Sequence, residues 1–250
     1  MNGTIQSLGV DRPSGDLPLE LARLHRTLDV GDRLVCRFEP VPDARWGSQM
    51  VVDLVAGAGF KLLGEPKTTG RSVEVQVERI HSLSDTVAPG MRLLVVGLNP
   101  SPYSSDRGVG YARPGNRFWP AALASGVASK DRDPDHALEH HGLGMTDLVR
   151  RTTARAEEVD PQEFSDGFAR VERLVGWLTP GATCFVGLSG WRLVVDRRAI
   201  AGVQPQQVGD RPVYLMPHTS GLNAHSRLAD LTDHLRAAGR LADDPNGAHF

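Results

Sequence analysis

Three short apolar runs, each followed by a loop and a helical segment, constrain the fold of this chain more than any other feature. The runs are RLLVVG at 92–97, ATCFVG at 182–187 and PVYLMP at 212–217. Continuous apolar runs of this length are typical of strands buried on both faces of a parallel sheet. Strand–loop–helix units in series indicate an α/β fold. We therefore expect a three-layer α/β/α sandwich with a mostly parallel central sheet.

The leading part of the chain predicts a second, smaller α/β unit. Its helices are expected at 17–28 and 49–58, where apolar residues recur at helical spacing. Its strands are expected at 33–38, 60–65 and 72–80, the last of which alternates between apolar and polar residues.

Shifts in composition divide the chain into four parts. Residues 1–16 are polar and rich in Gly, Ser and Asp, so a disordered tail is expected there. The VAPG within 85–90 indicates a linker. We therefore assign the α/β appendage to 17–88, the main domain to 89–240 and a frayed C-terminus to 241–250.

The composition of the 250 residues excludes several classes of protein. The only two cysteines, Cys36 and Cys184, cannot build a disulfide scaffold. No stretch approaches the roughly 20 apolar residues of a membrane span, and the N-terminus lacks the features of a secretory signal. A cytoplasmic protein without membrane contact is expected. The net charge of −2 provides no chain-wide basic field for nucleic acid.

Two loops rich in Gly, Pro and Ser follow the first and third apolar runs, at 97–119 and 217–226. Ligands of open α/β sheets bind outside the carboxyl ends of the strands, so chemistry is expected at these loops. Asn99 follows its strand directly, and Tyr111 lies in a glycine-rich stretch with room to stack on a planar ligand. The alternative is a structural turn in which Asn99 caps a helix and Tyr111 packs.

Four segments then occur in a fixed order: GLNPS at 97–101, YARPGNRFW at 111–119, GMTDLV at 144–149 and PHTSGLNAHSRL at 217–228. Together they resemble the mismatch-specific uracil/thymine DNA glycosylases, a branch of the uracil-DNA glycosylase superfamily, over residues 91–238. The resemblance implies that fold and hydrolysis of the N-glycosidic bond of uracil mispaired with guanine, in base excision repair. Thymine and other damaged pyrimidines are further candidate substrates. The base would be flipped out of double-stranded DNA. No cofactor and a monomer are expected.

The resemblance also implies how the base and the attacking water are held. Asn99 matches the residue that holds the water, and positioning must supply much of its effect because an amide is a weak base. Tyr111 matches the stacking aromatic, and the backbone around Leu98 and Tyr111 would read the pyrimidine edge. Ser104 would close around the pyrimidine 5-position, and Asn116 is a further candidate for substrate binding.

Two positions depart from the pattern of close relatives. His218 stands where they carry Asn, and it could donate a hydrogen bond to uracil O2 as negative charge develops there. Alternatively, His218 supports the loop or contacts a phosphate. Asp147 stands where relatives carry Lys, Asn or Asp. A carboxylate near Asn99 would act as a general base on the water, but Thr146-Asp147 is equally typical of a helix N-cap.

The second loop also carries the expected DNA contacts. Gly221-Leu222-Asn223 matches the wedge that enters the helix where the base has left, and an exposed Leu222 would offset the lost stacking. The alternative is that Leu222 is a core leucine. Ser220, Arg117 and Arg227 are the remaining candidate DNA contacts.

Metal and lyase chemistry are not expected. His136 and His140 have the i, i+4 spacing of metal ligands, but no third ligand pattern accompanies them. The three lysines, Lys61, Lys67 and Lys130, lie outside both motif loops, and a lyase needs an amine to form a Schiff base. We therefore predict a monofunctional glycosylase that leaves an abasic site.

Two other functions are weighed against this one. The first is a catalytically weak nucleic-acid-binding module of the same fold, against which the intact Asn99 argues. The second is a methyltransferase-related protein, because residues 17–82 weakly resemble the C-terminal third of a class I methyltransferase. A working site would need the rest of a nucleotide-binding half, and the glycosylase motifs begin there instead. We therefore expect a structural appendage.

Overall fold

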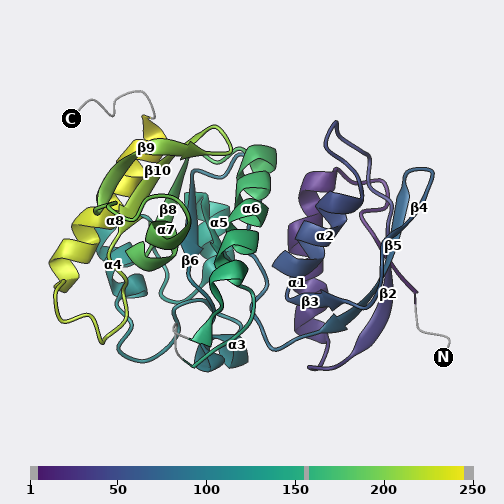
Figure 1. Ribbon diagram of the computed structural model, residues 1–250, viewed down its shortest axis with the longest axis horizontal. Coiled ribbons are helices and arrows are strands. Elements are labelled where there is room, and N and C mark those ends of the chain that lie inside the picture. Colours follow the sequence, from purple (N-terminus) through teal and green to yellow (C-terminus); the bar gives the residue numbers. More distant parts are fainter. Residues whose placement is uncertain (1–4, 155–157, 245–250) are drawn as a thin grey trace.

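The chain forms two α/β units that lie side by side in Figure 1. The larger unit is built on a five-stranded sheet with the strand order β7-β6-β8-β10-β9. The computed structural model describes residues 5–154 and 158–244. Neighbouring strands are parallel except β9, which pairs antiparallel with β10 at one edge. The strands are β6 (Leu93–Gly97), β7 (Leu143–Asp147), β8 (Ala182–Val186), β9 (Gly202–Val208) and β10 (Arg211–Met216).

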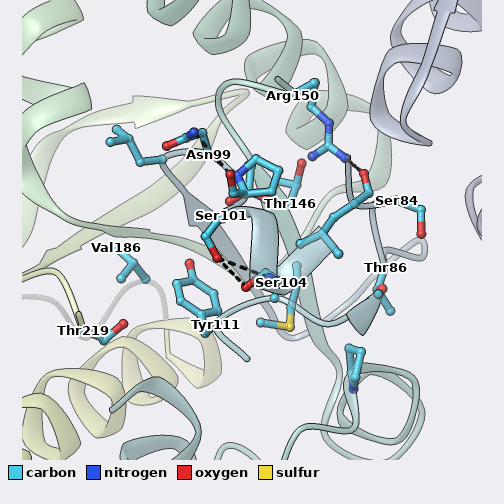
Figure 2. A pocket seen from close by; sticks show the side chains of 18 of the residues that line it. Ser84, Thr86, Asn99, Ser101, Ser104, Tyr111, Thr146, Arg150, Val186 and Thr219 are labelled. Atoms are coloured by element: carbon cyan, nitrogen blue, oxygen red, sulfur yellow. Dashed lines mark hydrogen bonds between the residues drawn. The ribbon is translucent and has the colours of Figure 1, made fainter. Parts of the chain in front are cut away.

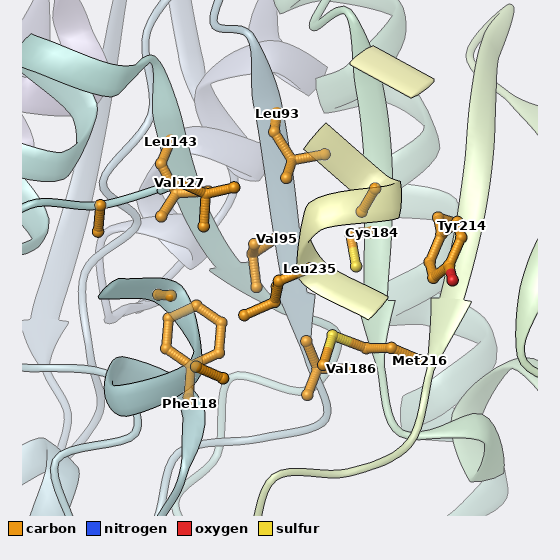
Figure 3. Close-up of a cluster of buried hydrophobic side chains, with 14 of the residues drawn as sticks. Leu93, Val95, Phe118, Val127, Leu143, Cys184, Val186, Tyr214, Met216 and Leu235 are labelled. Carbon is orange, nitrogen blue, oxygen red and sulfur yellow. The ribbon is translucent and has the colours of Figure 1, made fainter. Parts of the chain in front are cut away.

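Helices cover both faces of this sheet. Leu93 and Val95 point into the core under α4 and α8, which Figure 3 shows, whereas Leu94 and Val96 point into the core under α6 and α7. This alternation is that of a strand buried on both faces. The expected three-layer sandwich with a mostly parallel sheet is therefore confirmed. The helices are α3 (Pro102–Arg107), α4 (Phe118–Ser125), α5 (Pro134–His141), α6 (Pro161–Leu178), α7 (Leu188–Val194) and α8 (Leu228–Asp243).

The smaller unit has a mixed sheet with the strand order β1-β2-β5-β3, and β4 also pairs with β5. Its two helices lie on the face of the sheet that is turned toward the larger unit (Figure 1). The elements are β1 (Ile5–Leu8), the 3-10 helix η1 (Ser14–Asp16), α1 (Leu17–Thr27), β2 (Arg33–Phe38), α2 (Ser48–Gly57), β3 (Phe60–Leu62), β4 (Lys67–Thr69) and β5 (Ser72–Arg79).

The prediction of a disordered tail is wrong for residues 5–16. Ile5–Leu8 forms an edge strand parallel to β2, with Ile5 opposite Val35. Leu8 is fully buried in the core of the smaller unit, and this burial holds the strand in place. The prediction of fraying from residue 241 is likewise wrong at its start, because α8 continues to Asp243 and buries Leu241. Residues 1–4 and 245–250 lie outside the described residues.

Strand β7 is the element that most affects the site, and the sequence did not predict it. Its Gly144 sits close against Met91, where a Cβ would collide with the methionine sulfur. Thr146 and Asp147 end this strand, so the helix N-cap alternative for them is wrong. The parallel register places Asp147 directly opposite Gly97, the last residue of β6. Two of the motif loops therefore leave the sheet side by side.

Ion pairs connect the two units along their facing helices. Arg26 of α1 forms a bidentate pair with Asp135 of α5, at 2.7 and 2.8 Å. Arg173 of α6 forms another with Asp53 of α2, at 2.7 and 2.9 Å.

Candidate active site

A cavity of about 170 Å³ lies at the carboxyl ends of β6, β7 and β10 (Figure 2). Asn99, Asp147 and His218 line it, so the loops that follow these three strands converge on one space. The volume is several times the roughly 30 Å³ share of one water and below the roughly 300 Å³ at which drug-sized sites begin. It suits a single small ring.

Asn99 presents a defined face to the cavity. Its Nδ2 donates to Thr153 Oγ1 at 2.7 Å and to the Arg151 carbonyl at 3.3 Å. A carbonyl oxygen can only accept, so the NH2 end of the amide must point to that side. The Oδ1 end is left to accept a bond from a water. The alternative that Asn99 caps a helix is wrong, since Ser101 is the N-cap of α3.

Asp147 and Tyr111 meet over Gly97. A Cβ on Gly97 would collide with the Asp147 carboxylate and would lie 2.9 Å from the Tyr111 hydroxyl oxygen. The absence of a side chain at Gly97 therefore creates the space that both polar groups occupy. Burial raises the pKa of Asp147 to about 6, while the nearby Arg150 guanidinium opposes that rise. A carboxylate with a pKa near the working pH suits a general base.

Tyr111 is packed on one face and lines the cavity. Its ring stacks on Phe118, with centroids 4.2 Å apart and planes at 17°. Its φ of 58° is unusual for a residue with a side chain. The packing alternative therefore describes one face of Tyr111 only. Burial, together with the charge of Asp147, raises the pKa of the hydroxyl well above its usual value, so the hydroxyl is neutral.

His218 brings a neutral imidazole to the cavity. Burial lowers the pKa of His218, and the Arg117 guanidinium lowers it further. The ring is therefore uncharged at neutral pH, and a neutral imidazole has one N–H donor. The carbonyl of His218, rather than its ring, bonds within the loop and accepts from Asn223 Nδ2 at 2.8 Å.

Arg117 and Asn223, two predicted DNA contacts, bond the backbone of the second loop from inside. The Arg117 guanidinium donates to the carbonyls of Asn223 at 2.7 Å and Ser220 at 3.0 Å, and also to that of Ser226. These bonds involve both terminal nitrogens of the guanidinium, so a contact of Arg117 with a phosphate stays a prediction. Asn223 is buried and accepts from the backbone N–H of His225 at 3.0 Å. Both side chains hold the backbone of 218–226.

Leu222 projects from this loop with 85% of its surface exposed, so the core alternative is wrong. Its backbone N–H donates to Ser220 Oγ at 3.3 Å. Gly221 lies against the other loop, where a Cβ would come within 2.9 Å of the Gly115 carbonyl oxygen. The tip that carries Leu222 therefore packs against the first loop.

The other predicted site residues fall into two groups. Leu98 and Ser104 line the cavity, with Ser104 buried in α3. Asn116 does not line it, because its Oδ1 accepts from the Phe118 N–H at 2.9 Å at the start of α4. Arg227 caps α8 together with Asp230, and 87% of its side chain is exposed.

Several residues around the cavity were missed by sequence reasoning. Leu83, Ser84 and Thr86 line the cavity, although all three were assigned to the appendage at 17–88. Thr153 holds Asn99. Thr153 lies shortly after the GMTDLV segment, which is a weak sequence signal, whereas Leu83, Ser84 and Thr86 lie far from every motif segment.

A metal site is absent from the part of the chain that the structure describes: no three His, Cys, Asp or Glu residues gather there in an arrangement that could hold an ion. The His136 and His140 rings lie 4.2 Å apart on α5 and do not line the cavity. Within residues 5–154 and 158–244, no helix has the length and apolar character to cross a membrane.

Residues 84–239 match the Uracil DNA glycosylase superfamily. The match spans more than half of the chain and contains β6, β7, β10 and all the residues that line the cavity except Leu83. The chain therefore belongs to this superfamily. Membership indicates a DNA glycosylase of base excision repair, a hydrolase of N-glycosyl bonds whose substrate is DNA. The smaller unit, up to residue 83, lies outside the match.

Proposed function

We propose that this protein is a monofunctional, mismatch-specific glycosylase that releases uracil paired with guanine from double-stranded DNA. The observation that carries the proposal is the convergence of Asn99, Asp147 and His218 on one cavity with the volume of a single ring. The exposed Leu222 beside it supports base flipping, because an apolar wedge can replace the stacking that the flipped base loses. We further propose that it acts as a cytoplasmic monomer without a cofactor.

In the proposed reaction, a water held by Asn99 Oδ1 attacks the sugar C1′. Asp147 accepts the water proton as the new C1′–O bond forms. The C1′–N1 bond breaks, and its electron pair leaves with the uracil. His218 donates a hydrogen bond to uracil O2, where the negative charge develops, and the departing anion later takes a proton from solvent. Contacts of this kind are worth about 3 kcal/mol when they are aimed at developing charge.

The lysine positions support hydrolysis without strand cleavage. Lys61 and Lys67 lie in the sheet of the smaller unit, and Lys130 lies between α4 and α5. None of the three lines the cavity. Because no lysine lines the cavity in the part of the chain that the structure describes, a Schiff base with C1′ is not supported, and we propose that the product is an abasic site.

The test is incubation with labelled duplexes that contain one U·G, T·G or U·A pair. We expect U·G strands to break only after treatment with alkali. The T·G and U·A duplexes measure thymine acceptance and mismatch specificity. Absence of alkali-labile sites in all three duplexes would remove the enzymatic function and favour the binding-module or methyltransferase-related alternatives. Strand cleavage without alkali would contradict the monofunctional assignment.

A further inference from the structure

A buried ionic network connects the smaller unit to the end of β7. Asp85 accepts from Arg150 at 2.8 Å and from Arg170 of α6 at 2.9 Å. All three side chains are almost entirely excluded from solvent. The Thr146 hydroxyl donates to Asp85 at 2.6 Å, and Arg170 donates to the Asp147 carbonyl at 2.9 Å. The network therefore lies directly behind the proposed general base.

The smaller unit supplies the carbonyls that hold Arg150. The Arg150 guanidinium donates to the Gly57 carbonyl at 2.8 Å and to the Ala56 carbonyl at 3.3 Å, at the C-terminal end of α2. It also donates to the Leu83 carbonyl. A helix C-terminus attracts a cation because its last carbonyls are unpaired and carry partial negative charge. The Asp85 N–H donates to Gly57 O at 2.7 Å, so the same turn of α2 also holds the carboxylate.

The charges of the network do not balance unless Asp147, which lines the cavity, is counted with them. Two guanidinium groups face one carboxylate, which leaves one positive charge in excess. Asp147 is the next carboxyl group along this surface, and it lines the same cavity as Arg150. Excess positive charge stabilises the ionised form of a neighbouring carboxyl group. The groups that face Asp147 are Tyr111, Asp85, Arg150, Arg170 and His218.

We propose that Arg150 is a positioning residue through which the smaller unit acts on catalysis: the last turn of α2 fixes its guanidinium behind Asp147, where its charge keeps the general base ionised. Arg150 lines the cavity, but its proposed task is to act on Asp147 and not to bind the DNA base. The inference rests on the proposed role of Asp147 as the base. It gives the segment outside the superfamily match a specific task in the reaction.

The first test is the pH profile of single-turnover uracil release by the full-length chain with Arg150→Met. Loss of the nearby charge should raise the pKa of Asp147 further, by about one unit or more. The acid limb of the profile then moves to higher pH. At pH 6 the rate of the Arg150→Met variant should be about tenfold below that variant's own plateau rate. Arg150→Lys keeps the charge but not the multiple bonds, so it should shift the limb less.

A second variant reaches the network from the smaller unit without altering Arg150 or the cavity. A Cβ on Gly57 would collide with the Asp85 carboxylate and lie 2.9 Å from an Arg170 nitrogen. Gly57→Ala should therefore move the acid limb in the same direction by a smaller amount. Gly64→Ala is the matched control, because a Cβ there meets nothing within 4 Å. It should leave the profile unchanged.

A third measurement requires no catalytic activity, so it tests the charge coupling even if the protein does not release uracil. The pKa of Asp147 is raised on folding, so its stabilising effect is present at low pH and is lost as pH rises through about 6. The difference in melting temperature between the wild type and Asp147→Asn should therefore change across that window, and at higher pH when Arg150→Met is also present.

The outcomes are decisive in both directions. Acid limbs that coincide for the wild type, Arg150→Met and Gly57→Ala would overturn the proposal, even if both variants melt earlier. The proposal would also be overturned if the effect of Asp147→Asn on the melting temperature changed over the same pH window with Arg150 and with Arg150→Met. If Arg150→Met does not fold, Arg150→Lys and Gly57→Ala decide. A wild type that releases no uracil would remove the proposed function, while the melting measurement still judges the charge coupling.

Discussion

Asn99 is the residue on which the proposed hydrolysis depends most directly. Substitution with alanine removes the oxygen that orients the water, and the single-turnover rate should fall by about 10²-fold or more. The affinity for U·G duplex should not change, because the wedge and the loops remain. Asn116→Ala is the matched control, since the Asn116 side chain bonds a backbone N–H outside the cavity. An unchanged rate for Asn99→Ala would show that the water is held elsewhere.

His218 is expected to act on the leaving group rather than on the DNA. His218→Asn places a donor on a shorter side chain, so uracil release should slow by about 10-fold or more on duplex and single-stranded substrates alike. His225→Asn provides the comparison, because its imidazole lies on the same loop but does not line the cavity. Equal rates for the wild type and His218→Asn would reduce His218 to a support of the loop.

At the scale of elements, the loop that follows β10 is expected to separate base extrusion from bond cleavage. Leu222→Ala shortens the exposed wedge, so release from U·G duplex should slow by about tenfold or more while release from single-stranded DNA is unchanged. Ile200→Ala serves as the control, since that side chain is 72% exposed before β9 and away from the cavity. Equal slowing on both substrates would mean that Leu222 supports the loop instead.

The elements also show what the sequence could predict. The strand at 33–38 has the expected position, because a local pattern determines it. Strand β7 was missed since its edge position and glycine weaken the apolar pattern. The tail strand β1 was missed because its pairing with β2 is set by a partner far along the chain.

The site was predictable to a different degree. Motif order was enough to select Asn99, Asp147 and His218, which do line one cavity. Residue type was not enough to assign Arg117 and Asn223, because an arginine or asparagine in a loop can bond a carbonyl as readily as a phosphate. The carbonyls that Arg117 binds become its neighbours only when the two loops meet.

At the scale of the whole molecule, backbone carbonyls of the smaller unit hold a buried charged network of the larger unit, and this should make the two units unfold together. Arg170 lies within the network at the interface, whereas Arg173, one turn later on α6, forms a half-exposed pair with Asp53. A buried ion pair that loses one partner typically costs about 3–5 kcal/mol, while an exposed pair contributes about 1 kcal/mol or less.

Arg170→Met should therefore lower the melting temperature by about 10 °C, since about 1 kcal/mol corresponds to about 2–4 °C in a chain of this size. Arg173→Met should lower it by less than about 4 °C. Calorimetry of both variants should show one transition, as expected for the wild type, because unfolding of the smaller unit alone would remove the α2 carbonyls that hold Arg150. Two separate transitions, or equal losses for the two arginines, would show that the units are coupled only through their surface ion pairs.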